Sequence, residues 1–229
     1  MDASIIQKIT IWILPVLLAV SLHEAAHAWM ANKKGDPTAR LLGRLTFNPL
    51  KHIDPIGTIL VPILMLVFTG FAFGWAKPVP IDVRNLKNPK KDMMWVALAG
   101  PASNFIMAIM WAVFLNISVL FVDSRSSISL FFLLMPVAGI TINVILGVLN
   151  LLPIPPLDGG RIMSGLLSPR ASMQYSKIEP YGFFIIIALM LTGVLSNIIF
   201  PVINLVLLVL STISGLEMEV FYRLLNAIQ

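Results

Sequence analysis

The sequence consists of long apolar runs separated by short basic loops, a pattern that is typical of a membrane protein. A helix that spans a bilayer needs about 20 apolar residues. Three runs reach that length, and they cover residues 5–31, 93–122 and 128–152. Only 12% of the residues are charged, and the mean hydropathy is +0.90, which is too apolar for the surface of a soluble domain. The sequence therefore predicts an α-helical polytopic membrane protein.

A fourth apolar region, residues 181–214, is long enough for one span with a remainder or for two short spans. We expect two short spans, broken near Asn197 and Pro201. A further apolar stretch at residues 56–82 brings the expected total to about five to six membrane segments. No polar stretch is long enough to fold alone, so we expect residues 1–229 to form one domain.

Residues 56–82 are expected to enter the membrane and return to the same face. The loops before and after them each carry five Lys or Arg against two Asp. Basic loops favour the cytoplasmic side, so a complete span would leave one loop on the wrong side. Residues 70–82 contain glycines, aromatic residues and alternating Val and Pro, which suit an irregular re-entrant β-hairpin better than a helix. Such backbone is tolerated at membrane depth only where protein or a wet cavity supplies its hydrogen bonds.

The remaining loops fix the expected orientation. Residues 123–127 form a short, neutral turn suited to the outer side, and Arg161, Arg170 and Lys177 return the next loop to the cytoplasm. The N-terminus then lies outside. The net charge of +5 is thus explained by topology signals and not by a nucleic-acid-binding patch. We expect a multi-pass protein of a cell membrane, in a bacterium the inner membrane, surrounded by the lipid bilayer.

The clearest candidate for chemistry is the H-E-x-x-H motif His23-Glu24-Ala25-Ala26-His27 in the first apolar run. Histidines at i and i+4 share one helix face and can bind a single Zn²⁺. Zinc lowers the pKa of its bound water and polarises a carbonyl, while an adjacent carboxylate takes the water proton and passes it to the leaving amine. The motif therefore predicts peptide hydrolysis, with Glu24 as the general base and acid.

Alone, this motif is only moderately specific, because a solvated helix can carry the same residues on a plain polar face. Here its neighbours, IWILPVLLAVSL and AWMA, are apolar. Three ionisable groups in a bilayer helix are costly enough to indicate function. The only other histidine, His52, lies in a basic loop, where an interfacial loop residue is the simpler interpretation.

A hydrolytic zinc usually takes three protein ligands and leaves a fourth position for water. The chain has no Cys, so His and carboxylates must hold the metal. Most other acidic residues lie among lysines in loops, where a solvated surface charge is expected, but Asp158 follows a long apolar run in NLLPIPPLDGG. Both His27 and Asp158 lie a few residues from basic residues of the cytoplasmic interface, so we expect them at a similar depth. The alternative for Asp158 is a helix cap or Asx turn before Gly159 and Gly160.

Two other segments place polar or helix-breaking residues inside apolar runs. Asn150 and Pro153 interrupt a helix before Asp158; the exposed backbone groups could hold a substrate strand, or the residues could simply form a kink. Asn104 lies in GPASN, where it could approach the metal, or the small residues could serve only close helix packing. A transmembrane substrate must unwind at the cut, and residues 71–81 are expected to bind it by strand addition.

Taken in order, HEAAH, FGWAKPVP, GPASN and NLLPIPPLDGG resemble the motifs of the site-2 protease family of intramembrane zinc metalloproteases, the M50 peptidases, in its short bacterial form without a PDZ domain. The resemblance covers most of the chain. It implies a membrane-embedded β-hairpin at FGWAKPVP and substrates that are transmembrane segments of single-pass proteins. It also implies that His23, His27 and Asp158 bind one Zn²⁺ and that Glu24 is catalytic. Asn104, Asn150 and Pro153 are implied to lie near the active cleft.

Two other functions fit parts of the sequence. One class of zinc importers carries H-E-x-x-H in a membrane helix, but there the motif is partnered by a second helix rich in His and Asp, and His52 is the only further histidine here. A noncatalytic scaffold that binds zinc for stability needs no base, whereas Glu24 is present. We therefore expect an intramembrane zinc endopeptidase with its active site toward the cytoplasmic side, and keep a zinc transporter or a noncatalytic metal-binding scaffold as the alternative.

Overall fold

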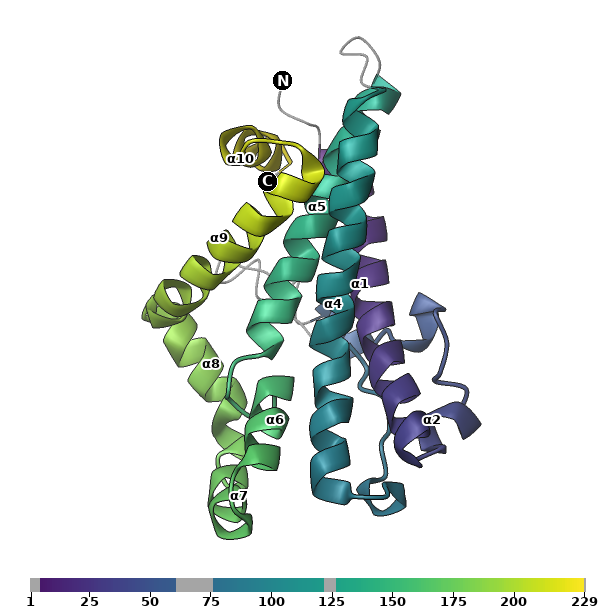
Figure 1. The fold of residues 1–229 in the computed structure, drawn as a ribbon, viewed down its shortest axis with the longest axis vertical. Coiled ribbons are helices and arrows are strands. Elements are labelled where there is room, and N and C mark those ends of the chain that lie inside the picture. The colour runs from purple at the N-terminus through teal and green to yellow at the C-terminus, as the bar shows by residue number, and fades with distance from the viewer. Residues whose placement is uncertain (1–4, 61–75, 122–126, 229) are drawn as a thin grey trace.

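Four long helices form the body of the protein in a computed structural model that describes residues 5–60, 76–121 and 127–228 (Figure 1). They are α1 (Ile5–Lys34), α4 (Pro89–Val119), α5 (Ser127–Asn150) and α9 (Val194–Ser214). Each is long and apolar enough to cross a membrane. The first three spans predicted from the sequence are thus confirmed as helices of sufficient length, and the chain fits a multi-pass membrane protein.

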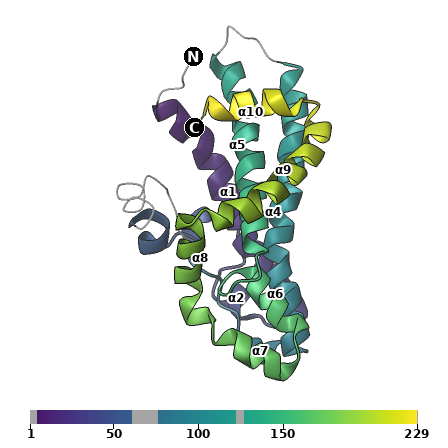
Figure 2. The same ribbon diagram turned by 90° about the vertical axis from the view of Figure 1, so that its left-hand side faces the viewer.

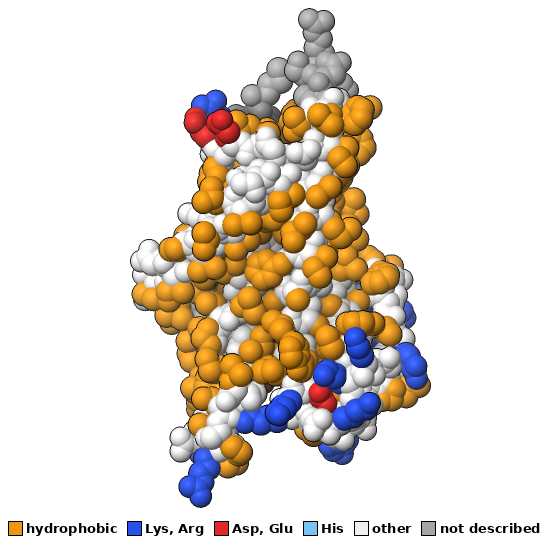
Figure 3. All heavy atoms as spheres, in the orientation of Figure 1, with side chains coloured by type: hydrophobic (Ala, Val, Ile, Leu, Met, Phe, Trp, Pro, Cys, Tyr) orange, Lys and Arg blue, Asp and Glu red, His pale blue; other side chains and the backbone are white. Residues whose placement is uncertain are grey.

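The packing is organised around α5. In its most apolar stretch 67% of the residues are buried, against 28–33% for the other three long helices. Buried side chains of α4, α5 and α9, such as Ala112, Val144 and Leu207, form the main apolar core. The outward faces keep large apolar side chains exposed, Ile109 and Leu208 among them, and such side chains cover most of the visible surface in Figure 3. Exposed apolar side chains on this scale suit lipid, not water.

The fourth apolar region is divided differently from the prediction. Its break lies at Gly193, between α8 (Gly182–Leu191) and α9, and not near Asn197 and Pro201. Gly193 adopts a left-handed conformation with φ of 73°, which glycine reaches without steric cost and which ends a helix. Pro201 lies inside α9 and does not end it, as membrane helices allow. The ten residues of α8 extend only about 15 Å, too short for a span of their own.

The two ends of the bundle differ in charge. α2 (Thr38–Leu41), the start of α4, α6 (Asp158–Leu166) and α7 (Pro169–Ser176) lie at the lower end in Figure 1. Most of the visible Lys and Arg side chains gather at this end in Figure 3. At the opposite end α10 (Met218–Asn226) lies across the bundle near both termini (Figure 2). The remaining short turns are η1 (Pro49–Lys51), η2 (Pro55–Leu60), η3 (Val83–Asn85) and η4 (Glu179–Tyr181).

The predicted re-entrant segment is described only at its two ends. Residues 61–75 lie outside the described part of the chain, residues 55–60 form the turn η2, and residues 76–82 contain no strand. Nor does any other residue in the described ranges 5–60, 76–121 and 127–228 form one. The ends nevertheless meet, because the Lys77 N–H donates to the carbonyl oxygen of His52 at 2.9 Å. The β-hairpin predicted over residues 70–82 therefore stays a prediction.

Candidate active site

Three buried side chains from distant parts of the sequence meet at one point between α1 and α6. His23 and His27 lie on one face of α1, and Asp158 is the first residue of α6. The Asp158 Oδ2 atom lies 3.2 Å from each of the two Nε2 atoms, and the Nε2 atoms lie 3.0 Å apart. All three residues are buried. His27 and Asp158, which were expected to lie at a similar depth, are therefore neighbours in the fold.

The backbone of α4 decides which nitrogen of His27 carries the proton. Its Nδ1 atom lies 2.7 Å from the carbonyl oxygen of Val96. A carbonyl oxygen only accepts hydrogen bonds, so Nδ1 must be the donor. In the neutral ring Nε2 then has a free lone pair, and this lone pair faces His23 and Asp158.

A chain of buried amides decides the same question for His23. The Asn143 Nδ2 group donates to the carbonyl oxygen of Gly139 at 2.9 Å, so its Oδ1 is left to accept from Asn104 Nδ2, also at 2.9 Å. Asn104 Nδ2 is held from a second side by the carbonyl oxygen of Ala19. Asn104 Oδ1 must then accept from His23 Nδ1, which lies 2.6 Å away. This direction of donation leaves the lone pair of His23 on Nε2.

With both rings neutral, the result is a buried cluster of three acceptor atoms that face one another. Two imidazole lone pairs and a carboxylate oxygen at 3.0–3.2 Å repel one another unless a cation lies between them. Donors about 2.0 Å from a tetrahedral zinc are separated by roughly 3.3 Å, close to the spacing here. The residues therefore fit a zinc ion with three protein ligands and a fourth position for water. Nδ1–H groups bonded to a carbonyl and an amide are also the usual support of zinc-bound histidines.

Gly100 explains how α4 comes so close to this cluster. A Cβ atom at position 100 would lie 2.4 Å from His27 Nε2 and 2.6 Å from His23 Cε1. Only glycine leaves this space open. The GPASN segment thus packs closely on α1 and places Asn104 against His23. Gly100 and Asn143 were not predicted as site residues, although a glycine inside an apolar helix was the available signal for the first.

Glu24 lies between His23 and His27 in α1, and its carboxylate has one hydrogen-bond partner among the described residues. Its Oε2 atom accepts a hydrogen bond of 2.8 Å from the backbone N–H of Val79. Glu24 is half-buried, in contrast to the buried histidines on either side of it. Its second oxygen, Oε1, has no hydrogen bond to the described residues. This oxygen is free to meet a water molecule or a substrate.

The loop between α5 and α6 aims Asp158 at the histidines. Asp158 does not cap its helix, because Leu157 occupies the cap position and makes no side-chain cap bond. A Cβ atom at Gly159 would lie 2.3 Å from the carbonyl oxygen of Leu151, so glycine allows α6 to fold back against the end of α5. The cap or Asx turn considered as the alternative role of Asp158 is thus not formed.

Asn150 and Pro153 are not brought to the metal cluster by direct contacts. The Asn150 Nδ2 group donates to the carbonyl oxygen of Leu146 in its own helix at 3.0 Å. The carbonyl oxygen of Pro153 accepts from the Tyr175 hydroxyl at 2.7 Å. The first bond lies within α5, and the second holds the connection after α5 against α7. The roles of these two residues in a substrate cleft remain predictions.

Two polar residues expected at the surface are buried. His52 is 1% exposed, and its Nε2 lies 3.0 Å from the carbonyl oxygen of Thr46. Asp36 is fully buried and accepts hydrogen bonds from Thr38, from the Asp82 N–H at 2.7 Å and from Asn85 Nδ2 at 3.1 Å. The interpretation of His52 as an interfacial residue, and of the loop acids as solvated charges, was wrong at these positions, because the loops fold onto each other.

Asp36 is expected to contribute strongly to stability. Burial raises the pKa of its carboxyl, but bonds from Thr38, Asn85 and the Asp82 N–H outweigh burial and hold the pKa below its ordinary value. The contribution is thus present above about pH 4, the unfolded pKa, and is lost as the pH falls through the folded pKa. In Asp36→Asn the side-chain amide N–H₂ replaces one carboxylate oxygen and faces at least one donor, the Asp82 N–H. This should cost about 2 kcal/mol and lower the melting temperature by about 5 °C.

Thermal denaturation of the purified protein in detergent at pH 7 measures this effect. Glu179→Gln is the matched control, because Glu179 is exposed and has no hydrogen bond to the residues described. An unchanged melting temperature in Asp36→Asn would show that its hydrogen bonds do not hold the two loops together.

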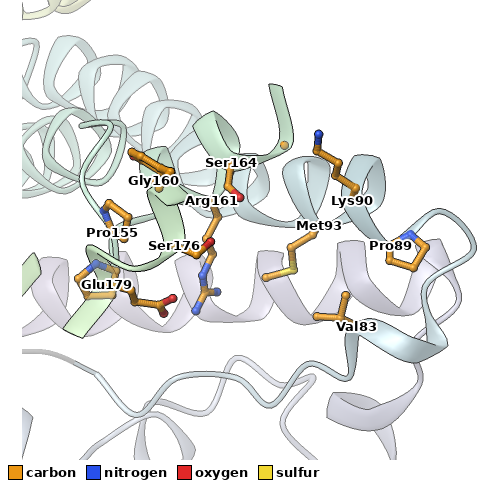
Figure 4. Close-up of a pocket in the computed structure, with 13 residues that line it drawn as sticks. Val83, Pro89, Lys90, Met93, Pro155, Gly160, Arg161, Ser164, Ser176 and Glu179 are labelled. Carbon is orange, nitrogen blue, oxygen red and sulfur yellow. The ribbon is translucent and has the colours of Figure 1, made fainter. Parts of the chain in front are cut away.

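A cavity of about 360 Å³ opens beside α6 at the basic end of the bundle (Figure 4). It lies between the start of α4 and the α6–α7 pair, with the side chains of Lys90, Met93, Arg161 and Ser164 around it. Gly160, two residues after Asp158, is part of its wall. None of the three residues of the His23–His27–Asp158 cluster lines this cavity.

The sequence is similar to several proteins named as zinc metalloproteases. The profile of Peptidase family M50 matches residues 117–193. Putative zinc metalloprotease YwhC of Bacillus subtilis is 36% identical over 200 residues, which cover 84% of this chain and 85% of that protein. Putative zinc metalloprotease Rip2 of Mycolicibacterium smegmatis is 30% identical over 187 residues, or 82% of this chain and 69% of the relative.

A more distant similarity extends to an archaeal protein. Zinc metalloprotease MJ0392 of Methanocaldococcus jannaschii is 29% identical over 208 residues, which cover 88% of this chain and 49% of that longer protein. No solved structure matches this chain.

Proposed function

Because this chain belongs to Peptidase family M50 and is a zinc metalloendopeptidase, we propose that it hydrolyses peptide bonds of transmembrane segments within the bilayer, with Glu24 as the general base. The observation that carries the proposal is the buried cluster of His23, His27 and Asp158, whose ligand-capable atoms face one another at 3.0–3.2 Å. We assign these three residues as the ligands of one zinc ion.

The position of the cluster supports hydrolysis inside the membrane. His23 and His27 lie within α1, a helix long and apolar enough to span the bilayer. They lie seven residues or more before Lys34 at the end of that helix, or about 10 Å of helix. A peptide bond that reaches them must therefore leave the aqueous phase or already lie in the bilayer.

Each residue of the proposed site has a separate task. Bound zinc supplies a polarising charge and a water of lowered pKa. Glu24, held at Oε2 and free at Oε1, takes the water proton and delivers it to the leaving amine. Asn104 keeps the lone pair of His23 directed at the metal, and the Val96 carbonyl does so for His27. The buried site keeps bulk water from competing for these groups.

Substrate unwinding is a necessary part of this function. A transmembrane helix hides its carbonyls in its own hydrogen bonds, and unsatisfied amides in an apolar site cost several kcal/mol each. We therefore expect single-pass segments with Gly, Pro or Asn near the cut to be cleaved more readily than rigid Leu-rich ones.

The test of the proposed function compares wild type with Glu24→Gln in detergent. Both are incubated with a panel of single-pass model segments, and zinc content is measured on the same preparations. Removal of the base is expected to lower turnover about 100- to 10,000-fold and to leave zinc bound. Cleavage by Glu24→Gln at the wild-type rate would exclude Glu24 as the base, and an inactive wild type would exclude the segments tested as substrates.

The orientation in the membrane gives a separate prediction. We expect Arg40 and Lys87, both exposed, to face the cytoplasm, since the chain returns between them and the two ends of residues 53–76 meet. The chain has no native Cys, so Arg40→Cys and Lys87→Cys give single reporters. An impermeant thiol reagent added outside should label neither. Asn226→Cys in α10 is the control and should be labelled from outside.

Labelling of positions 40 and 87 from opposite faces would show that residues 53–76 cross the bilayer. The basic end of the bundle would then no longer be a single cytoplasmic face, and the proposed orientation would be wrong.

A further inference from the structure

The segment that contacts Glu24 has an unusual backbone. Its sequence is Lys77-Pro78-Val79-Pro80-Ile81. Proline has no N–H, so Val79 has the only N–H between those of Lys77 and Ile81. That single donor is the one bonded to Glu24 Oε2 at 2.8 Å.

The two prolines also restrict the shape of this segment. A residue before proline is pushed out of the helical region into extended conformations, and this applies to Lys77 and Val79. The chain therefore crosses the Glu24 side chain as a stiff, extended strip. Its conformation is fixed locally and does not depend on Glu24.

Contacts on both sides hold the strip against the body of the protein. Upstream, the Arg44 guanidinium donates to the carbonyl oxygen of Lys77 at 2.8 Å, and the Lys77 N–H is taken by His52. Downstream, Asp36 accepts from the Asp82 N–H at 2.7 Å. In between, the Val79 side chain is 8% exposed and packs against Ala28 of α1 and Ala39 of α2.

We infer that the Val79 backbone N–H is a positioning group that holds the Glu24 carboxylate in its reactive orientation. It fixes Oε2, and Oε1, which has no hydrogen bond to the described residues, is the oxygen that we assign to the water. The inference rests on the proposed function of Glu24 as general base. An unheld glutamate on a helix surface has several rotamers, and most of them would carry its oxygens away from the metal cluster.

This role changes what the strip can offer a substrate. Strand addition along residues 71–81 needs backbone groups that can pair with a substrate strand. Residues 76–81 are the described part of this range, and their backbone N–H groups are those of Ala76, Lys77, Val79 and Ile81. The Val79 N–H is already bonded to Glu24. A substrate strand beside Val79 would therefore meet carbonyl acceptors. At this position the donors come from the substrate.

The test replaces the Val79 amide by an ester and keeps the side chain. The α-hydroxy analogue of valine is incorporated at position 79 of the full-length protein, which deletes the N–H alone. We expect kcat to fall about 10- to 100-fold, KM to stay within about twofold, and the zinc content to stay at wild-type level. Val79→Ala, which keeps the N–H, is expected to lose several-fold less.

The matched control is the same ester at Ile81, whose N–H has no hydrogen bond to the described residues. It should retain the kcat of wild type. Loss of zinc at position 79, or an equal loss of kcat at positions 79 and 81, would overturn the inference in favour of a general disturbance of the loop. Wild-type kcat in the position 79 ester with an inactive Glu24→Gln would overturn the positioning role alone, whereas an active Glu24→Gln would refute the proposed function itself.

Discussion

Gly100→Ala is expected to abolish zinc binding and activity together. The added Cβ atom would lie 2.4 Å from His27 Nε2, in the space between α4 and the metal ligands. The nearest atoms belong to buried rings whose Nδ1 atoms are fixed by Val96 and Asn104, so these rings cannot turn aside without losing a hydrogen bond. We expect the metal content to fall from about one zinc per chain to near zero, as measured by elemental analysis after purification.

Gly147→Ala in α5 is the control for this change. There the three atoms nearest to an added Cβ belong to the Phe105 ring, at 3.0–3.2 Å, and the ring can shift by a few tenths of an ångström. We expect normal zinc content and activity in this variant. If Gly100→Ala bound zinc at the wild-type level, the close approach of α4 to His27 would not exist in the working enzyme.

The second large effect concerns the proposed ligands themselves. In the double variant His23→Ala, His27→Ala two of three protein ligands are absent, and a single carboxylate cannot retain zinc against dilution. We expect loss of at least 90% of the zinc and no detectable cleavage. The reason is that tight zinc binding needs the full set of protein ligands. Thr10→Ala, in the same helix but bonded only to the Ile6 carbonyl, should keep both.

Retention of one zinc per chain in the double variant would place the metal elsewhere and remove the assignment of Asp158 as well. The measurement must accompany a check of folding, since the ligands are buried. Circular dichroism in detergent serves this purpose because the helices, and not the site, dominate the signal.

Much of this architecture can be predicted from local patterns of the sequence. The spans at α1, α4 and α5 follow from apolar length alone, and the His23–His27 pair follows from helical spacing. Asp158 could be proposed because it is an acid at the end of an apolar run. Some of these features depend on residues that are near one another in the chain. The others depend on the high free-energy cost of placing a charged group in lipid.

The features that escaped prediction depend on contacts between distant segments. Asn143 is an ordinary polar residue in α5 until the fold places it beside Asn104. Asp36 and His52 have loop sequences around them, and only the packing of two loops buries them. The break was predicted near Asn197 and Pro201 and lies at Gly193, because a proline inside a membrane helix need not end it.

The geometry of the acceptor cluster also bears on how the whole chain is held together. His27 and Asp158 are separated by about 130 residues, so an ion shared between them closes a very long loop, and closure of loops of this length removes several kcal/mol of chain entropy from the unfolded state. Zinc would then act as a cross-link between the N-terminal helix and the C-terminal half. Chelation should free the two halves from each other, with proteolytic sensitivity appearing first in the α5–α6 connection, well before the helices themselves melt.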